Sequence, residues 1–126
     1  MDFRKFYIPT VIAGLAILTS ANQALAQART DLTGTWVCDQ NAPNPFYIRQ
    51  VDSELWGIQD GGFTFTNAFH GTNLGGSISG TWADVPKAVF RQYGTVSGKV
   101  DSYNQITLYF TFANAGGQVT KFTCNR

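Results

Sequence analysis

His70 is the only histidine in the 126-residue chain, so it is the only side chain whose ordinary pKa suits acid–base catalysis near neutral pH. A hydrolytic triad would also need a positioned nucleophile and an orienting carboxylate, and the sequence contains no Gly-x-Ser-x-Gly elbow. Because His70 follows Phe69, strand alternation places it on the outer face if Phe69 faces the core. We expect no catalytic residue, and we do not expect an enzyme.

The carboxylates form no recognisable reactive pair or metal-ligand motif. Glu54 is the only glutamate, and four aspartates fall at predicted strand ends and turns, where aspartate commonly bonds backbone groups: Asp39, Asp52, Asp60 and Asp101. A glycosidase needs two carboxylates held across a cleft, and an EF-hand needs a fixed spacing of oxygen ligands. The sequence predicts no metal site and no cofactor.

Aromatic and hydrogen-bonding residues are concentrated between residues 46 and 86, and they form the candidate ligand-binding set. Its members are Tyr47, Arg49, Trp56, Asn67, His70, Trp82 and Asp84. A tryptophan beside an arginine and a carboxylate can hold a small polar ligand or a sugar ring by stacking and a few convergent hydrogen bonds. In the alternative interpretation, the tryptophans are core residues, and Arg49 and Asp84 form an ion pair that closes one end of the fold.

The elements that would position these residues are β-strands, because apolar residues recur at every second position after residue 33. The predicted strands cover residues 34–39, 46–51, 54–59, 67–72, 77–83, 93–100, 106–112 and 118–124. Short turn sequences link neighbouring strands, so the expected order is an up-and-down meander. Closing this all-β meander into an eight-stranded antiparallel barrel removes its two exposed edges. A two-sheet β-sandwich built from the same strands is the alternative fold.

The two cysteines, Cys38 and Cys124, lie in the first and the last predicted strand. In an oxidising compartment an even pair of this kind most simply forms one disulfide, whereas a zinc site would need further ligands such as nearby histidines. The predicted disulfide would join the two strands that meet where the barrel closes. The cysteines and the strand count therefore support the same closed fold.

The first 26 residues have the three parts of a cleavable signal peptide in the expected order. Arg4 and Lys5 provide the positive end, residues 8–18 form a mostly apolar stretch, and Ala24-Leu25-Ala26 is a small-residue cleavage site. The apolar stretch is shorter than the ~20 residues that a spanning helix requires. We expect cleavage after Ala26, export to a periplasm or out of the cell, and a single β-barrel domain over residues 27–126.

The charge of the mature chain excludes some classes of partner. Cleavage removes Arg4, Lys5 and Asp2 from the nine basic and eight acidic residues, which leaves seven of each. The sequence has no run of lysines or arginines, so it lacks the basic footprint of a nucleic-acid-binding protein or of a membrane-surface patch. With no membrane span expected in the mature chain, the expected partner is a small molecule or glycan, or another protein.

Two short patterns resemble known families. Gly34-Thr35-Trp36, at the start of the first predicted strand, resembles the Gly-x-Trp that opens lipocalin and avidin-like barrels, although the chain is shorter than a typical lipocalin and shows no set of biotin-binding residues. A second pattern, over residues 33–100, is similar to small exported bacterial domains of unknown function; its segments are Tyr47-Ile48-Arg49-Gln50, Leu55-Trp56, Phe69-His70-Gly71 and Gly80–Lys87. These resemblances imply a small calycin-like barrel and transfer no activity.

The sequence therefore predicts a non-catalytic binding module for a small apolar or sugar-like ligand, held at a barrel mouth or on the surface. The alternative is a structural or protein-interaction domain of the cell envelope or secretome, with a solid core filled by Phe69, Phe110, Phe112 and Phe122. An eight-stranded barrel is just wide enough to be filled by its own side chains or to hold one small ligand. Aromatic residues make up 14% of the chain, which favours a site at one mouth over a large interior cavity.

Overall fold

The computed structural model describes residues 30–39 and 44–126. The predicted signal peptide (1–26), with its cleavage site after Ala26, lies outside the described residues, as do residues 40–43. The described chain forms these strands and one short 3-10 helix: β1 (Gly34–Cys38), β2 (Phe46–Val51), β3 (Glu54–Asp60), β4 (Phe65–Leu74), β5 (Ser77–Pro86), β6 (Tyr93–Ser102), β7 (Gln105–Phe112), η1 (Ala113–Ala115) and β8 (Gln118–Asn125).

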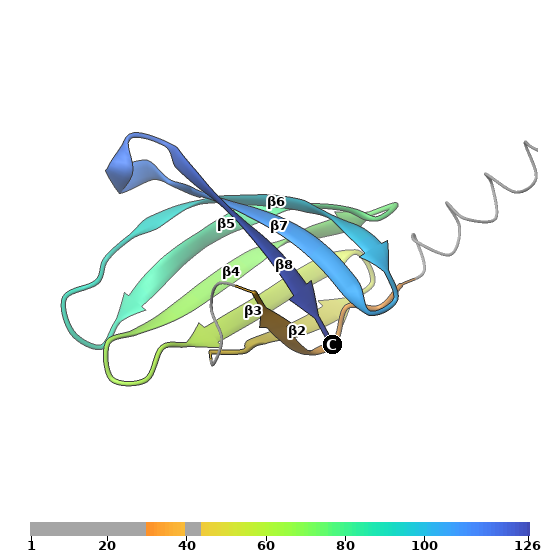
Figure 1. Ribbon diagram of the computed structural model, residues 1–126, viewed down its shortest axis with the longest axis horizontal. Coiled ribbons are helices and arrows are strands. Elements are labelled where there is room, and N and C mark those ends of the chain that lie inside the picture. Colours follow the sequence, from red (N-terminus) through yellow and green to blue (C-terminus); the bar gives the residue numbers. More distant parts are fainter. Residues whose placement is uncertain (1–29, 40–43) are drawn as a thin grey trace, which may run out of the picture.

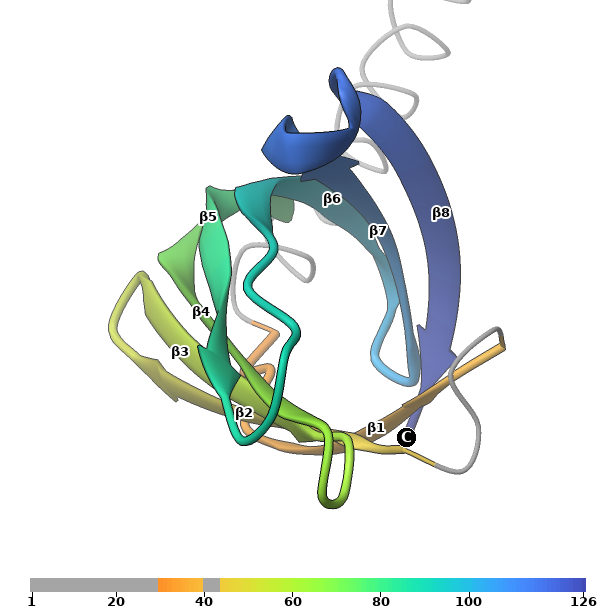
Figure 2. The same cartoon turned by 90° about the vertical axis from the view of Figure 1, so that its left-hand side faces the viewer.

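The strands form a closed antiparallel barrel in meander order, shown from the side in Figure 1 and end-on in Figure 2. Each strand pairs with its neighbours in sequence, and β1 also pairs with β8. This arrangement confirms the predicted eight-stranded up-and-down barrel and rules out the two-sheet sandwich. Closure gives partners to the two terminal strands, whose exposed edges would otherwise invite pairing with other chains.

The seam between β1 and β8 is short and carries the disulfide. Its register has two residue pairs, one of which is Cys38 with Cys124, and these cysteines are bonded as predicted. Asp39 extends the seam, because its N–H donates to Thr123 O (3.0 Å) and its Oδ1 accepts the Thr123 N–H (3.0 Å). A covalent link therefore reinforces the shortest ladder of the barrel.

Alternation along the strands separates the core from the outer surface. It is most regular in β3, where Leu55, Gly57 and Gln59 are buried and the residues between them are exposed. The bare backbone of Gly57 faces the ring of Phe69, which occupies the space that a side chain would need. The buried apolar core comprises Leu32, Trp36, Phe46, Ile48, Leu55, Phe69, Ile78, Trp82, Val96, Val100, Ile106, Leu108, Phe110, Phe122 and the two cysteines.

The segment that precedes β1, residues 30–33, closes the end of the barrel on the right of Figure 1. Leu32 is completely buried there, and its carbonyl accepts a hydrogen bond from Trp36 Nε1 (2.8 Å). The Leu32 N–H donates to Gln50 Oε1 (3.1 Å). Because this segment has no ladder partner, side chains of the barrel satisfy its backbone groups instead.

Arg126, which follows β8, reaches across the same closed end. Its Nη1 donates to the carbonyls of Asp31 (2.8 Å) and Thr33 (3.3 Å), and its Nε donates to Tyr103 O (2.8 Å). The guanidinium carbon lies 4.6 Å from the ring centroid of Trp36, within the range of a cation–π contact. The beginning and the end of the described chain are therefore bound together over Trp36.

At the opposite end, β4 and β5 extend further than the sequence pattern predicts. β4 begins at Phe65 rather than Asn67, and β5 ends at Pro86 rather than Ala83. The ladder between β5 and β6 stops at Ala83, so Pro86 lies at the end of a strand with β4 alone beside it, a position that tolerates proline. The extra residues form part of the wall of the open end, which faces the viewer in Figure 2.

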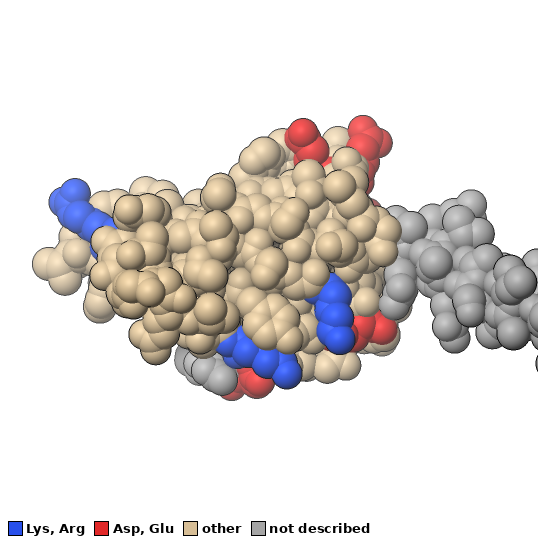
Figure 3. Space-filling model, turned by 90° about the horizontal axis from the view of Figure 1, so that it is seen from above, with Lys and Arg blue, Asp and Glu red and all other residues tan. Residues whose placement is uncertain are grey.

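Charged side chains are scattered over the surface, and the face in Figure 3 is largely uncharged between them. Among the described residues the ion pairs are Lys87–Asp60 (2.8 Å), Lys99–Asp101 (3.6 Å) and, when the imidazole is protonated, His70–Glu54 (4.0 Å).

Within residues 30–39 and 44–126, no helix is long and apolar enough to cross a membrane.

Candidate functional site

The barrel wall divides the predicted ligand-binding set into two groups. The members that line the interior of the open end are Asn67, Trp82 and Asp84. The members exposed on the outer face are Tyr47, Arg49, Trp56 and His70. Only the first group lines the interior of the barrel, so the predicted set is not one site.

Arg49 and Asp84 do not form the ion pair considered as an alternative. Arg49 is exposed and lies opposite Trp56 in the β2–β3 ladder, whereas Asp84 lies opposite Asn67 in the β4–β5 ladder and lines the interior. Directly opposed residues of an antiparallel pair point to the same side of the sheet. The two side chains therefore lie on different sides of the wall, and the interpretation of a closing ion pair is wrong.

The open end holds a cavity of about 180 Å³, which we call the mouth cavity. Its lining comes from the ends of β2, β3, β4, β5, β7 and β8 and from the loop before β6. The aromatic lining residues are Phe46, Phe65, Trp82, Phe90, Phe110, Phe112 and Phe122, and the polar ones are Gln59, Asn67, Asp84 and Gln92. The mouth cavity is therefore an aromatic chamber with one polar wall.

The aromatic rings of the mouth cavity support one another. The Phe110 ring lies 5.8 Å from those of Phe46 and Trp82 and 5.4 Å from that of Phe122, measured between centroids. Trp82 also meets Phe112 edge to face at 5.1 Å. Rings packed in this way hold their positions without a ligand, so the apolar part of the cavity is preformed.

Asp84 organises the polar wall. Its Oδ1 accepts a hydrogen bond from Asn67 Nδ2 (3.3 Å), and its Oδ2 accepts the backbone N–H of Gln92 (3.0 Å). The Asp84 N–H in turn donates to Gln92 O (2.7 Å). The aspartate therefore fastens the end of the β5–β6 loop to the rim of the cavity.

Asn67 brings an unpaired acceptor into the same wall. The residue is 7% exposed, and its Oδ1 accepts no hydrogen bond in the described part of the chain. An ionised carboxylate only accepts hydrogen bonds, so the Asn67 amide has to turn its nitrogen, and not its oxygen, toward Asp84. A buried acceptor without a donor costs about 1–3 kcal/mol.

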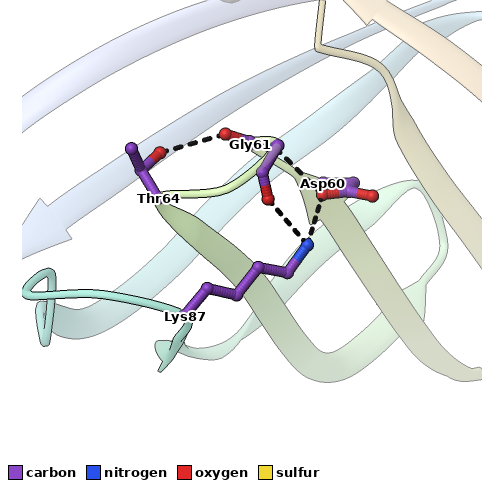
Figure 4. A network of polar contacts seen from close by, with 5 residues as sticks. Asp60, Gly61, Thr64 and Lys87 are labelled. Atoms are coloured by element: carbon purple, nitrogen blue, oxygen red, sulfur yellow. Dashed lines mark hydrogen bonds and ion pairs between the residues drawn. The ribbon is translucent and has the colours of Figure 1, made fainter.

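Lys87 links the two loops beside the mouth cavity, as Figure 4 shows. Its Nζ donates to Asp60 Oδ1 and to Gly62 O, both at 2.8 Å, and the Gly62 N–H donates to the same aspartate oxygen (3.0 Å). The hydrogen bond from Lys87, followed by the one from Gly62, lowers the pKa of Asp60 below its ordinary value of 3.8. The β3–β4 and β5–β6 loops are therefore held together at neutral pH.

Several residues of the mouth cavity were missed by the sequence analysis. Gln59 carries a usable signal, because it continues the inward alternation of Leu55 and Gly57 in β3. Phe90 and Gln92 carry none, since they lie in the loop between β5 and β6, where no periodicity applies. Only the folded barrel brings these two residues to the rim.

The outer face of β2–β6 carries a second feature, which we call the apolar strip. It is one uninterrupted cross-strand row of Tyr47, Ile58, Ala68, Ala83 and Tyr93. The adjacent row contains Arg49, Trp56 and His70, and the Trp56 and His70 rings lie 5.2 Å apart. The strip is open to solvent, with Tyr47, Ile58 and Tyr93 about half-exposed.

Comparison with known proteins adds no assignment, since no family model, no curated protein and no solved structure matches the chain. Within the part of the chain that the structure describes, no group of three or more His, Cys, Asp or Glu side chains is placed to hold a metal ion. The site is therefore interpreted from its own geometry. On that basis the mouth cavity, inside the barrel end, is better defined than the solvent-exposed apolar strip.

Proposed function

We propose that this protein is an exported, non-catalytic binding module that holds a small, largely apolar ligand in the mouth cavity. The observation that carries the proposal is an aromatic-lined space of about 180 Å³ at one end of a barrel whose centre is filled by core side chains. Small-molecule sites are typically concave, mostly apolar and preformed, with a few polar groups that fix orientation. The ring walls and the Asn67–Asp84 pair combine these properties.

The volume of the mouth cavity sets the size of the ligand. An apolar protein cavity of about 150 Å³ can hold benzene, so a cavity of about 180 Å³ suits one ring with a short substituent. A sugar ring would bury its hydroxyl groups against phenylalanine side chains, with few partners to replace the water they lose. An apolar ring is therefore the better match of the two ligand classes expected from the sequence.

Export is part of the proposal. The Cys38–Cys124 disulfide supports it, since disulfides form and persist mainly in oxidising compartments. The signal-peptide pattern over residues 1–26 supports it independently. The ligand would therefore be met in a periplasm or outside the cell.

Thermal unfolding of the oxidised protein against a panel of one-ring compounds, monosaccharides and short lipids tests the proposal. A ligand that binds only the folded state adds about 2.7 kcal/mol at a hundredfold its Kd, which raises Tm by roughly 10 °C for a domain of this size. We expect such a shift with one-ring compounds and none with lipids longer than the cavity.

A pair of substitutions locates the binding site. Gln92→Trp places a large ring at the rim of the mouth cavity, whereas Asn104→Trp adds the same ring at an exposed turn between β6 and β7, at the closed end. We expect Gln92→Trp to abolish the Tm shift and Asn104→Trp to preserve it. A shift that survives Gln92→Trp would place the ligand elsewhere.

A second function, protein interaction, is favoured by the apolar strip. Its row of Tyr47, Ile58, Ala68, Ala83 and Tyr93 contains no charged side chain, and exposed apolar patches of monomeric domains are often interaction sites. The same panel separates the two functions. If no compound shifts the Tm, small-molecule binding fails and the apolar strip becomes the favoured site.

A further inference from the structure

We infer that the ligand of the mouth cavity is a small organic ammonium ion, in which one apolar ring carries a positively charged amine. The inference rests on the proposed function and names the chemistry of its ligand. Three features carry it: one buried acceptor without a donor, a carboxylate without a cationic partner among the described residues, and walls of aromatic rings.

In the polar wall of the mouth cavity, the buried group without a partner among the described residues is an acceptor, Asn67 Oδ1. The side-chain nitrogens of Trp82, Gln59 and Asn67 each donate to a protein oxygen, at 2.9, 3.1 and 3.3 Å. The Asn67 amide oxygen accepts nothing within residues 30–39 and 44–126. Among the described residues, the buried side-chain atom of this wall that lacks a partner is therefore an acceptor, which favours a ligand that brings N–H groups.

Asp84 has no cationic partner among the described residues. The nearest lysine in sequence, Lys87, is directed elsewhere, because its Nζ bonds Asp60 and the Gly62 carbonyl. Each Asp84 oxygen accepts one of the hydrogen bonds described above, and a carboxylate can accept about four. Asp84 therefore keeps spare acceptor capacity for a charged donor from a ligand.

The aromatic walls strengthen the preference for a cation. An ammonium group within about 6 Å of a ring face is attracted by the ring quadrupole, and rings that surround such a group are a recognised way to bind organic cations. Trp82 and six phenylalanines line the same space as Asp84. An amine that bonds Asp84 would therefore lie among rings, while the ring of the ligand fills the apolar chamber.

Other ligand chemistries use the mouth cavity less completely. An anionic ligand would be repelled by the Asp84 carboxylate at short range, in surroundings that screen charge poorly. A neutral alcohol can donate one hydrogen bond, but it lacks the charge that makes hydrogen bonds to carboxylates strong. The positively charged amine is the class that satisfies the acceptors and the carboxylate together.

Isothermal titration calorimetry of the oxidised protein with four probes of similar size tests the inference. The probes are benzylamine, benzyl alcohol, ethylbenzene and benzoate. We expect benzylamine at neutral pH to bind about tenfold more tightly than benzyl alcohol, or better, since charge-assisted hydrogen bonds are about twice as strong as neutral ones. We expect benzoate to bind most weakly.

Two matched substitutions assign the preference to Asp84. Asp84→Asn keeps the shape of the side chain and removes its charge, so benzylamine should fall to about the affinity of benzyl alcohol. Glu54→Gln makes the same change on the outer face, where Glu54 lies near His70. This control should leave the ranking of the four probes unchanged.

The possible failures are distinguishable. If benzyl alcohol or ethylbenzene binds the unmodified protein as tightly as benzylamine, the ammonium inference is wrong and the proposed function stands. If none of the four probes binds and the wider panel produces no Tm shift, the proposed function fails as well. The affinities of the four probes are ranked on the unmodified protein. The inference can therefore be rejected even if the Asp84→Asn variant does not fold.

Discussion

The two ends of the barrel are built from the same strands but are filled in different ways. At the closed end, residues 30–33 pack over Trp36, and their carbonyls accept hydrogen bonds from Trp36 and Arg126. At the open end, the side chains stop short of filling the interior, and the mouth cavity of about 180 Å³ remains. One end is closed by protein groups, and the other keeps the space that the proposed ligand would occupy.

A buried tryptophan at each end makes the contrast specific. Trp36 Nε1 donates to Leu32 O (2.8 Å), and Trp82 Nε1 donates to Thr111 O (2.9 Å). Trp36 is covered by the Arg126 guanidinium, whereas Trp82 lines the cavity. The same residue type, with the same kind of hydrogen bond, is covered by protein at one end and lines a cavity at the other. In the proposed function, only the second ring contacts the ligand.

Removing the disulfide should have the largest effect on stability and leave the open end intact. The link between Cys38 and Cys124 spans a sequence separation of 86, and the chain-entropy model assigns a loop of that length about 4–5 kcal/mol. We expect the double variant Cys38→Ser/Cys124→Ser to lose about that much free energy of unfolding, measured in urea. At low temperature, the fraction that stays folded should bind the one-ring probes with unchanged affinity. A parallel loss of affinity would show that the two ends are not independent.

The two tryptophans provide a matched comparison of intermediate size. Trp36→Phe leaves the Leu32 carbonyl without its side-chain donor in a completely buried place, so we expect a loss of about 1–3 kcal/mol with no change in probe affinity. Trp82→Phe breaks an equivalent bond beside the cavity, where water can reach, so we expect a smaller loss together with weaker probe binding. Urea unfolding and calorimetry on both variants measure the two quantities. If Trp36→Phe and Trp82→Phe lowered the free energy of unfolding equally and weakened probe binding equally, the two ends of the barrel would not differ in the way described.

Much of the barrel could be predicted from the sequence, because strand alternation is a local property. Leu55, Gly57 and Gln59 repeat at every second position, and that spacing alone places them inward. Cys38 and Cys124 could be paired because they lie in the strands that closure brings together. These predictions needed no knowledge of which residue lies opposite which.

The candidate site was harder to predict, because it depends on register and on a loop. Arg49 lies in β2 and Asp84 in β5, and the cross-strand register together with the burial pattern shows that they lie on opposite sides of the wall. Phe90 and Gln92 reach the mouth cavity because Asp84 fastens the loop end, a contact across an irregular loop that no periodic pattern encodes. Sequence patterns therefore predicted the wall of the barrel better than what its mouth contains.

The smallest predicted effect compares one aspartate at each end under acid conditions. Lys87 lowers the pKa of Asp60 at the open end, and the Thr33 hydroxyl and N–H lower the pKa of Asp31 at the closed end. A carboxyl whose pKa is lowered by folding contributes stability above its ordinary value of 3.8, and this contribution is lost as pH falls through the lowered pKa. We therefore expect Asp60→Asn and Asp31→Asn each to be slightly less stable than the unmodified protein at pH 7. Both differences should disappear toward pH 2, as urea unfolding across this pH range would show.

Binding kinetics should separate these two aspartates, although their effects on stability are alike. Asp60 holds the β3–β4 loop to Lys87 beside the mouth cavity, so Asp60→Asn should loosen the rim and speed the dissociation of a one-ring probe a few-fold. Lys87→Met should have the same effect, since it removes the other partner. Asp31 lies at the closed end, so Asp31→Asn should leave the dissociation rate unchanged in stopped-flow measurements. If all three variants release the probe at the rate of the unmodified protein, the loops beside the cavity do not control access, and the cavity is reached by another route.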